Sequence, residues 1–319
     1  MIDFRYHLVS IVSIFLALAV GIVLGAGPLK GDLGTRLTQE TTALRADKAE
    51  LRTELDAEKR GTAARDSFSS SVAPVIMKGQ LKGKTVALVI APGADSDLVK
   101  NITVSLAAAG AKVGSTITLT DAWADPAKRT FRNTLADQLA TLVEAPLVAD
   151  NPDELVATVL ARAILGGKDL STERVAPAAS AALDGLKAGD LVKMSPDQIV
   201  LSSSAIIVGG PVKGSSQPDI DARLASYVQM VRSLKAAGSG VVVVTLTNAT
   251  NLKESADLVT AVRKDSDAVK VVSTVDDADL PMGQTTVVLA LAEQYSGGKG
   301  QYGLAADAKA ITPDLTAKQ

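Results

Sequence analysis

The sequence contains no cysteine, and histidine occurs once, at His7. Without cysteine the chain forms no disulfide and offers no thiolate to zinc, to an iron–sulfur cluster or to thiol catalysis. Because the single histidine lies so close to the beginning, the rest of the chain can form neither a Ser-His-Asp triad nor a histidine-rich metal site. These absences exclude thiol and triad catalysis and metal sites built on cysteine or histidine, and we expect no catalytic residue and no cofactor in this chain.

Clusters of basic residues and of soft metal ligands are also missing. The 33 Lys and Arg against 35 Asp and Glu give a net charge of −2, and no basic run stands out, so we expect no nucleic-acid partner. Beyond Met1, the methionines are far apart in the sequence, at Met77, Met194, Met230 and Met282. Cu(I) selects thiolate and thioether ligands, whereas isolated methionines usually fill gaps in a core.

A long apolar segment is present, the uncharged run Leu8–Gly27. About 20 apolar residues at ~1.5 Å per residue match the ~30 Å hydrocarbon layer of a bilayer. A cleaved secretory signal is the alternative, but its apolar core is usually shorter, about 7–15 residues. We predict an uncleaved transmembrane signal anchor over residues 1–29, with Arg5 favouring a cytoplasmic N-terminus. The protein is then a single-pass protein of the cell membrane with an extracytoplasmic C-terminal domain.

Small residues recur at every fourth position of this anchor, at Ala17, Gly21 and Gly25. Such a stripe lets two membrane helices pack closely. The alternative is that glycine is simply common in membrane helices.

Leucines recur at heptad spacing in the polar segment that follows, residues 30–66. Leu37, Leu44 and Leu51 take the d positions and Leu55 an a position. This pattern predicts a coiled-coil stalk with these four leucines at its interface, and together with the anchor it favours a parallel homodimer. A single solvated helix, or pairing with another protein's helix, are the alternatives.

Residues 67–83 are rich in serine and contain Gly79 and Gly83, which predicts a linker. Residues 84–303 alternate apolar runs with amphipathic segments, which predicts an α/β domain. We expect an open, mostly parallel, Rossmann-like sheet with helices on both faces, and a flexible tail over residues 304–319. The first predicted strand begins at Lys84. The other predicted strands cover 112–119, 199–208, 240–246 and 269–274. The predicted helices cover 96–110, 126–142, 153–165, 172–187, 219–237 and 252–264, while 285–293 reads as a helix that could begin as a strand.

Two loops are candidate ligand sites. The first follows a predicted strand and carries Gly209, Gly210, Lys213 and Ser215, whose backbone N–H groups could face an anion. It lacks the P-loop spacing, so an ordinary strand-to-helix turn is the stronger interpretation. The second contains Asp276, Asp277 and Asp279, which could hold a hard cation but lack a calcium-loop spacing, and we expect a solvated turn.

Two segments resemble a known family. RYHLVSIVSIFLALAVGIVLGAGPL at the beginning, and GQTTVVLALAEQYSGGKGQYG at 283–303, are similar to the actinobacterial MctB-like proteins, often described as copper transporters. The resemblance implies a single-pass envelope protein, with copper as the metal implied by the family. It also extends to SteB-like members, which act with a SteA-like membrane partner and a peptidoglycan hydrolase of the RipA type in cell division.

We therefore expect first a non-enzymatic envelope scaffold that dimerises or binds partners through its coiled coil, in the regulation of cell division and of a peptidoglycan hydrolase. Copper homeostasis, by transport, efflux or a channel, is the alternative. A third hypothesis is an extracytoplasmic small-ligand-binding α/β domain.

Overall fold

The computed structural model describes residues 4–25, 29–146, 152–167, 175–195, 199–247, 255–314 and 316. The chain divides into two compact units, Met1–Arg65 and Asp66–Gln319. The first unit is helical, and the second holds the sheet.

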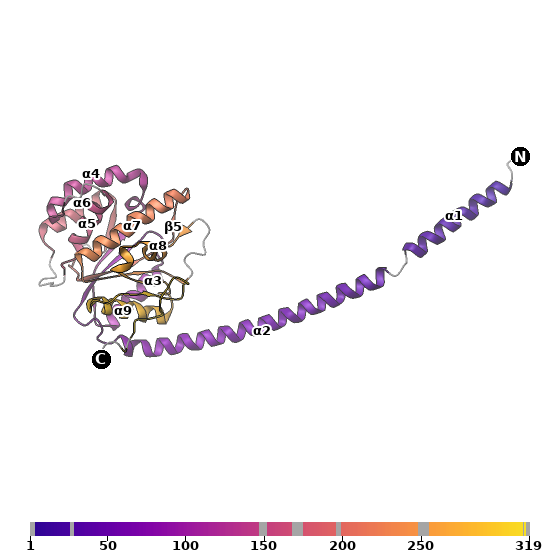
Figure 1. Ribbon diagram of the computed structural model, residues 1–319, viewed down its shortest axis with the longest axis horizontal. Helices are drawn as coiled ribbons and strands as arrows, with labels where there is room; N and C mark the ends of the chain where they lie inside the picture. The colour runs from indigo at the N-terminus through magenta and orange to yellow at the C-terminus, as the bar shows by residue number, and fades with distance from the viewer. Residues whose placement is uncertain are drawn as a thin grey trace. The chain divides into compact units, whose positions relative to one another are not determined.

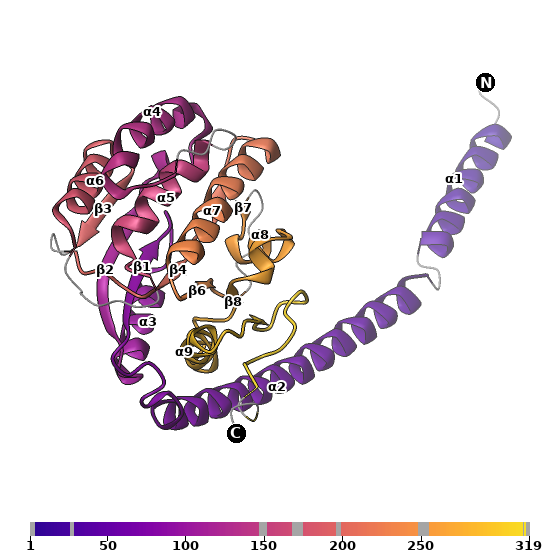
Figure 2. The same ribbon diagram turned by 60° about the vertical axis from the view of Figure 1, so that its left-hand side comes forward.

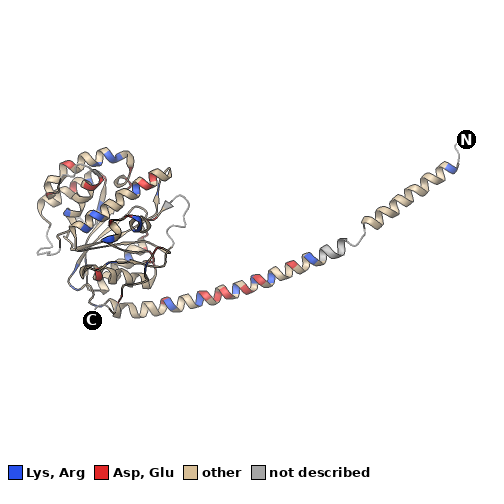
Figure 3. Cartoon of the chain, in the orientation of Figure 1, with Lys and Arg blue, Asp and Glu red and all other residues tan. Residues whose placement is uncertain are grey.

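Helix α1, Phe4–Gly25, fits the predicted membrane anchor. It has a mean hydropathy of 2.8 and no buried residue, and among the described residues it is the one helix long and apolar enough to cross a membrane. Its one charged residue is Arg5, in the first turn. Figure 3 shows the rest of this helix free of charged residues. An apolar helix with every side chain exposed is suited to lipid as its surroundings.

Helix α2, Leu29–Met77, continues through the region that we predicted as a linker. The prediction of a linker over 67–83 is therefore wrong as far as Met77. Ser71 Oγ donates to the carbonyl oxygen of Ser67 at 2.8 Å, so this serine is accommodated within the helix. Ala73 and Met77 are buried against the sheet domain, and this packing outweighs the weak helix propensity of the serine-rich stretch. The turn comes only at Gly79 and Gly83, which adopt positive φ.

A seven-stranded sheet forms the centre of the second unit, in the order β3-β2-β1-β4-β6-β8-β9. Neighbouring strands run parallel except at one edge, where β2 and β3 are antiparallel. Figure 2 shows β3, β2, β1, β4, β6 and β8 side by side in this order. The strand directions confirm the predicted mostly parallel α/β fold. The strands are β1 (Thr85–Ile90), β2 (Lys112–Leu119), β3 (Val192–Ser195), β4 (Ser204–Val208), β6 (Gly240–Val244), β8 (Ser273–Val275) and β9 (Gln301–Tyr302); a separate two-stranded sheet pairs β5 (Val212–Lys213) with β7 (Ser255–Ala256).

Helices cover both faces of the sheet (Figure 1). Side chains alternate along each strand, so Ala87 and Val89 of β1 join one apolar core and Val86 and Leu88 join the other. The first core includes helices α4 to α8, and the second includes α3, α9 and the end of α2. The helices are α3 (Ser96–Ala108), α4 (Arg129–Ala140), α5 (Pro152–Ile164), α6 (Pro177–Ala188), α7 (Gln217–Ala237), α8 (Leu258–Lys264) and α9 (Pro281–Tyr295), with 3-10 turns at Asp121–Trp123, Pro126–Lys128, Thr141–Val143 and Ala268–Lys270.

Several boundaries differ from the prediction. The helix predicted over 172–187 begins at Pro177, and the helix predicted over 252–264 begins at Leu258, because Ser255–Ala256 forms strand β7 instead. The segment 285–293 is helical throughout, because Pro281 begins α9 and the Thr285 hydroxyl donates to its carbonyl oxygen. The predicted strand 199–208 begins only at Ser204, and 269–274 begins with a 3-10 turn before β8. The short strands β3, β5, β7 and β9 were not predicted, since two to four residues show no clear periodicity.

The tail predicted to be flexible, 304–319, is docked in its described part. The Gly303 N–H donates to the carbonyl oxygen of Ala310 at 3.0 Å, and Arg263 forms an ion pair with Asp307 at 2.6 Å. Pro313 is buried. The prediction fails over 304–314 because these contacts depend on side chains remote in the sequence; residues 315 and 317–319 lie outside the described part.

Candidate functional site

The sheet topology indicates a candidate site at the carboxyl ends of the central strands. From β1 the chain passes to β2 on one side, and then returns to β4 on the other side of β1. In open α/β sheets, ligands bind outside the carboxyl ends of the strands where the strand order reverses in this way. Here that position lies between the loops that follow β1 and β4, and the second loop is the one that carries Gly209 to Ser215.

Close packing explains the two neighbouring glycines of that loop. A Cβ on Gly210 would lie 2.4 Å from the Pro92 carbonyl oxygen and 2.5 Å from the Ala94 nitrogen. A Cβ on Gly209 would lie 2.8 Å from the Thr245 Cγ2. The backbones of the two loops thus touch, and they leave no gap for a ligand between Gly210 and the β1 loop.

The turn after β1 depends on Gly93, whose φ is +73°. We expect Gly93→Ala to lower the free energy of unfolding by about 1–2 kcal/mol, because a side chain disfavours left-handed backbone. Its Cβ would have room, since the nearest atom, the Pro211 Cδ, is 3.6 Å away. Urea denaturation measures the change; an unchanged midpoint would show that the turn relaxes without cost.

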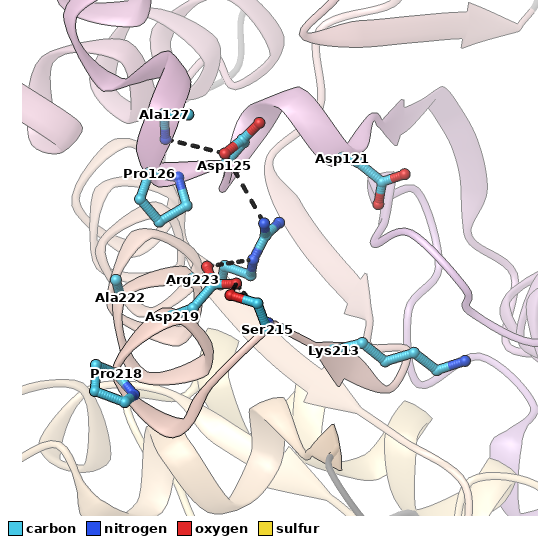
Figure 4. Close-up of a pocket in the computed structure, with 11 residues that line it drawn as sticks. Asp121, Asp125, Pro126, Ala127, Lys213, Ser215, Pro218, Asp219, Ala222 and Arg223 are labelled. Carbon is cyan, nitrogen blue, oxygen red and sulfur yellow. Dashed lines mark hydrogen bonds and ion pairs between the residues drawn. The ribbon is translucent and has the colours of Figure 1, made fainter.

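An open depression of about 860 Å³ lies beside these loops. It is bounded by the 3-10 turns after β2, by the end of the β4 loop and by the first turns of α7 (Figure 4). Five charged side chains line it: Asp121, Asp125, Lys213, Asp219 and Arg223. Only Lys213 was singled out from the sequence. The i,i+4 spacing of Asp219 and Arg223 at a helix start is a signal that could have revealed that pair.

Asp219 occupies the donors that an anion would need. Its Oδ2 accepts hydrogen bonds from the Ser215 N–H at 2.8 Å and from the Ser215 hydroxyl at 3.1 Å. Its Oδ1 accepts from the Arg223 Nε at 2.9 Å. The Ser215 backbone N–H is the main reason that the pKa of Asp219 lies below its usual value, with Arg223 adding to the effect. A phosphate would have to displace this internal carboxylate.

The remaining charges face different directions. Asp125 caps the 3-10 turn by accepting from the Ala127 N–H at 3.0 Å, and it lies 3.9 Å from Arg223. Lys213 is exposed and points away from the Asp219–Arg223 pair (Figure 4). The depression therefore presents paired charges, and the anion-binding role of the loop stays a prediction that this geometry does not favour.

The second candidate loop is not a solvated turn, contrary to our expectation. Asp276 and Asp277 are both buried after β8, and Asp276 lies 2.7 Å from Arg263. Burial, reinforced by the neighbouring charge of Asp276, raises the pKa of Asp277 to about 6. Asp279 accepts from the N–H and hydroxyl of Thr247 at 2.6 and 2.8 Å. Among the described residues, no three His, Cys, Asp or Glu side chains converge as metal ligands.

The methionines lie in four different elements. Met77 of α2 and Met230 of α7 are buried in separate cores, Met194 lies on β3, and Met282 lies in the first turn of α9. These four described methionines therefore do not meet in one soft-metal site, and Met77 and Met230 fill apolar space in the cores.

The predicted association residues are exposed on the first unit. A Cβ on Gly21 or Gly25 would meet no atom within 4 Å, and Ala17 lies on the same face of α1. On α2 the four leucines of the predicted coiled-coil interface are each more than half exposed, at 55% for Leu37, 67% for Leu44, 63% for Leu51 and 53% for Leu55. Pairing of either helix stays a prediction.

Comparison with known proteins covers nearly the whole chain. Residues 1–313 match the family described as "Copper transport outer membrane protein, MctB". Proteins named "Copper transporter MctB" from Mycobacterium tuberculosis and Mycobacterium bovis are 28% identical over 324 residues, which cover 98% of this chain and 99% of each relative. The protein of that name from Mycobacterium leprae is 26% identical over 320 residues. The match includes α1 and α2 as well as the sheet domain, and the chain belongs to the MctB family.

Proposed function

We propose that this chain acts in copper homeostasis at the cell envelope, as a non-enzymatic, single-pass protein. The observation that carries the proposal is the family match over residues 1–313. This match covers the anchor, the stalk and the domain together, and the relatives that it finds are named for copper transport. The alternative that we drew from the sequence thus has better support than the cell-division scaffold.

The structure limits how the chain can contribute to transport. One membrane helix cannot line a pore by itself, so any pore would need several copies or another protein. The described methionines lie in different elements, and two of them, Met77 and Met230, are in cores where a copper ion would have to disrupt packing. We therefore infer that the chain contributes by assembling or supporting a copper pathway.

Deletion of the gene in its own organism tests this function. We expect the deletion strain to accumulate copper under copper load, as measured by mass spectrometry of washed cells, and the full chain to restore the normal level. A chain with Met77, Met194, Met230 and Met282 each changed to leucine should also restore it, since these swaps nearly conserve volume. Unchanged copper in the deletion strain would contradict the function. Failure of a folded methionine variant would instead show direct copper ligation.

The proposed topology places the sheet domain outside the cytoplasm. Arg5 and the amino group before α1 favour a cytoplasmic N-terminus. An alkaline phosphatase fused at Gln319 should then be active in intact cells, and a cytoplasmic reporter fused at the same position should not. The reverse pattern would contradict the topology.

A scaffold for envelope partners is a second candidate, favoured by the exposed leucines of α2. It fits a role in organising a SteA-like partner or a hydrolase, although the names of the relatives refer only to copper transport. Normal cell separation in the deletion strain would contradict it.

A further inference from the structure

Helix α2 carries a seam of leucines that are exposed in the described part of the chain. Between residues 35 and 66, Leu37, Leu44, Leu51 and Leu55 are the only large aliphatic or aromatic side chains. All four fall at a or d heptad positions, and all four are more than half exposed. We propose that a second copy of this chain covers the seam, parallel and in register. The proposal does not depend on what the protein transports.

The charges that flank the seam specify this partner. The g positions hold Glu40, Asp47 and Glu54, and the e positions hold Arg45, Arg52 and Lys59. In a parallel pair, each g residue faces the e residue five positions later in the other helix. Glu40 then faces Arg45 of the second copy, Asp47 faces Arg52, and Glu54 faces Lys59. Each of the three successive contacts joins opposite charges, and each occurs twice because of the twofold symmetry. Figure 3 shows the alternating acidic and basic groups along α2.

The same charges oppose an antiparallel pair. Antiparallel helices bring g to g and e to e, which here places acidic groups against acidic groups and basic groups against basic groups. Within residues 35–77, whose side chains the structure describes, none of these six groups has an ion pair or side-chain hydrogen bond. They are therefore free to pair across an interface.

Two residues at a positions favour a small assembly. Thr41 and Lys48 are polar where a larger bundle would bury them completely, and polar a residues favour two strands in fixed register. Lys48 can extend its ammonium group past the seam into water. The charge pattern ends at Lys59, because Gly61 takes the next g position.

The membrane anchor gives an independent argument for the parallel orientation. Helix α2 begins at Leu29, only a few residues after α1 ends at Gly25. An antiparallel overlap of residues 29–59 would separate the two anchors by about 45 Å, at ~1.5 Å per residue. For a stalk that stands upright on the membrane, the second anchor would then lie beyond the ~30 Å hydrocarbon layer that holds the first, so the two anchors would not share one membrane. A parallel pair inserts both from the same side.

Introduced cysteines test the contact in the full-length chain, which has no cysteine of its own. Membranes from cells that express Leu44→Cys are oxidised mildly and analysed without reductant. We expect most of the chain to run as a disulfide-linked dimer, because the two d positions face each other. The control Ala46→Cys lies on the outer f position and should form at least fivefold less dimer. Equal crosslinking of the two variants would overturn the proposal.

A second pair of cysteines reports the orientation. Leu37→Cys should link to itself when the helices are parallel and in register. In an antiparallel pair, a positions face d positions, so Leu37→Cys would instead link to a chain with Leu55→Cys at the opposite end of the seam. A Leu37→Cys crosslink to Leu55→Cys that exceeds the self-crosslink would overturn the assigned orientation, and a crosslink to a different protein would overturn the homodimer.

Charge exchange tests the specificity in the Leu44→Cys background. One variant carries Glu40→Lys, Asp47→Lys and Glu54→Lys, and the other carries Arg45→Glu, Arg52→Glu and Lys59→Glu. Each alone should lose at least fivefold in crosslinked dimer, and co-expression of the two with different tags should restore a mixed dimer. Dimer retained by either variant alone would overturn the role of the charges. The thermal unfolding of the sheet domain should be the same in all variants.

Discussion

Replacement of Arg132 by methionine is expected to lower the free energy of unfolding of the sheet domain by about 3–5 kcal/mol. Arg132 is 1% exposed, and its NH2 lies 3.0 Å from the Asp153 Oδ1. Its NH1 donates to the carbonyl oxygens of Ala122 and Asp125. Methionine fills much of the same volume but leaves these three acceptors in the interior without their donor.

Arg129→Met is the matched control, because Arg129 contacts the same carboxylate from the surface. Its NH2 lies 2.7 Å from the Asp153 Oδ2, yet its side chain is 57% exposed. We expect a loss of only about 0–1 kcal/mol, since solvent replaces an exposed partner. Urea denaturation of both variants measures the difference. Equal losses would show that distance, rather than burial, determines the contribution of each arginine.

The same network predicts a response to acid. Burial alone would raise the pKa of Asp153, but hydrogen bonds from Arg129 and Arg132 bring it below the usual value. A carboxylate with a lowered pKa stabilises the fold above its unfolded pKa, and this contribution disappears as the pH falls through the folded value. The Ser226 hydroxyl also donates to Asp153, so the network holds α4, α5 and α7 together.

Asp277→Asn is expected to stabilise the domain at neutral pH and to have little effect in acid. Asp277 is 0% exposed, and its pKa is raised from 3.8 to about 6. The folded state therefore binds a proton that the unfolded state has already released, and stability falls as the pH rises from about 4 to about 6. The shift of roughly two units corresponds to about 3 kcal/mol of instability above pH 7, which the neutral asparagine removes.

The measurement is the unfolding free energy of both proteins between pH 4 and pH 8. The difference should be near zero at pH 4 and should reach its full value above pH 7. Asp137→Asn, on the exposed face of α4, is the control and should stay within about 0.5 kcal/mol of the parent chain. A constant difference across the pH range would contradict the raised pKa and would point to packing instead.

Elements with a strong local pattern were predicted well. The strand 112–119 has the predicted bounds, and the helix after Asp95 begins where that side chain accepts from the Leu98 N–H at 2.9 Å. The apolar helix α1 is equally clear, because its length and composition need no tertiary contact to be recognised. In each case the signal lies within about 20 consecutive residues.

The candidate sites were predicted less well, because their geometry depends on residues distant in sequence. Gly210 looks like part of an anion-binding loop until Pro92 is found against it. Asp276 and Asp277 look like a solvated turn until Arg263 and the packed β8–α9 connection are known. The helical stretch 67–77 and the docked tail have the same explanation, since Ala73 and Pro313 are buried by partners that no local pattern shows.

The sequence by itself determined the apolar helix α1, the heptad spacing of the leucines with their flanking charges and the alternating α/β plan, because each is encoded by composition or periodicity along a continuous segment. Only the tertiary structure decided which polar groups are buried. The properties of Asp219, Asp153 and Asp277 come from neighbours brought together by folding: Ser215 for Asp219, two arginines for Asp153, and burial beside Asp276 for Asp277. Periodicity specifies which face of an element is apolar, whereas the pKa and partner of a charged group depend on contacts across the sheet.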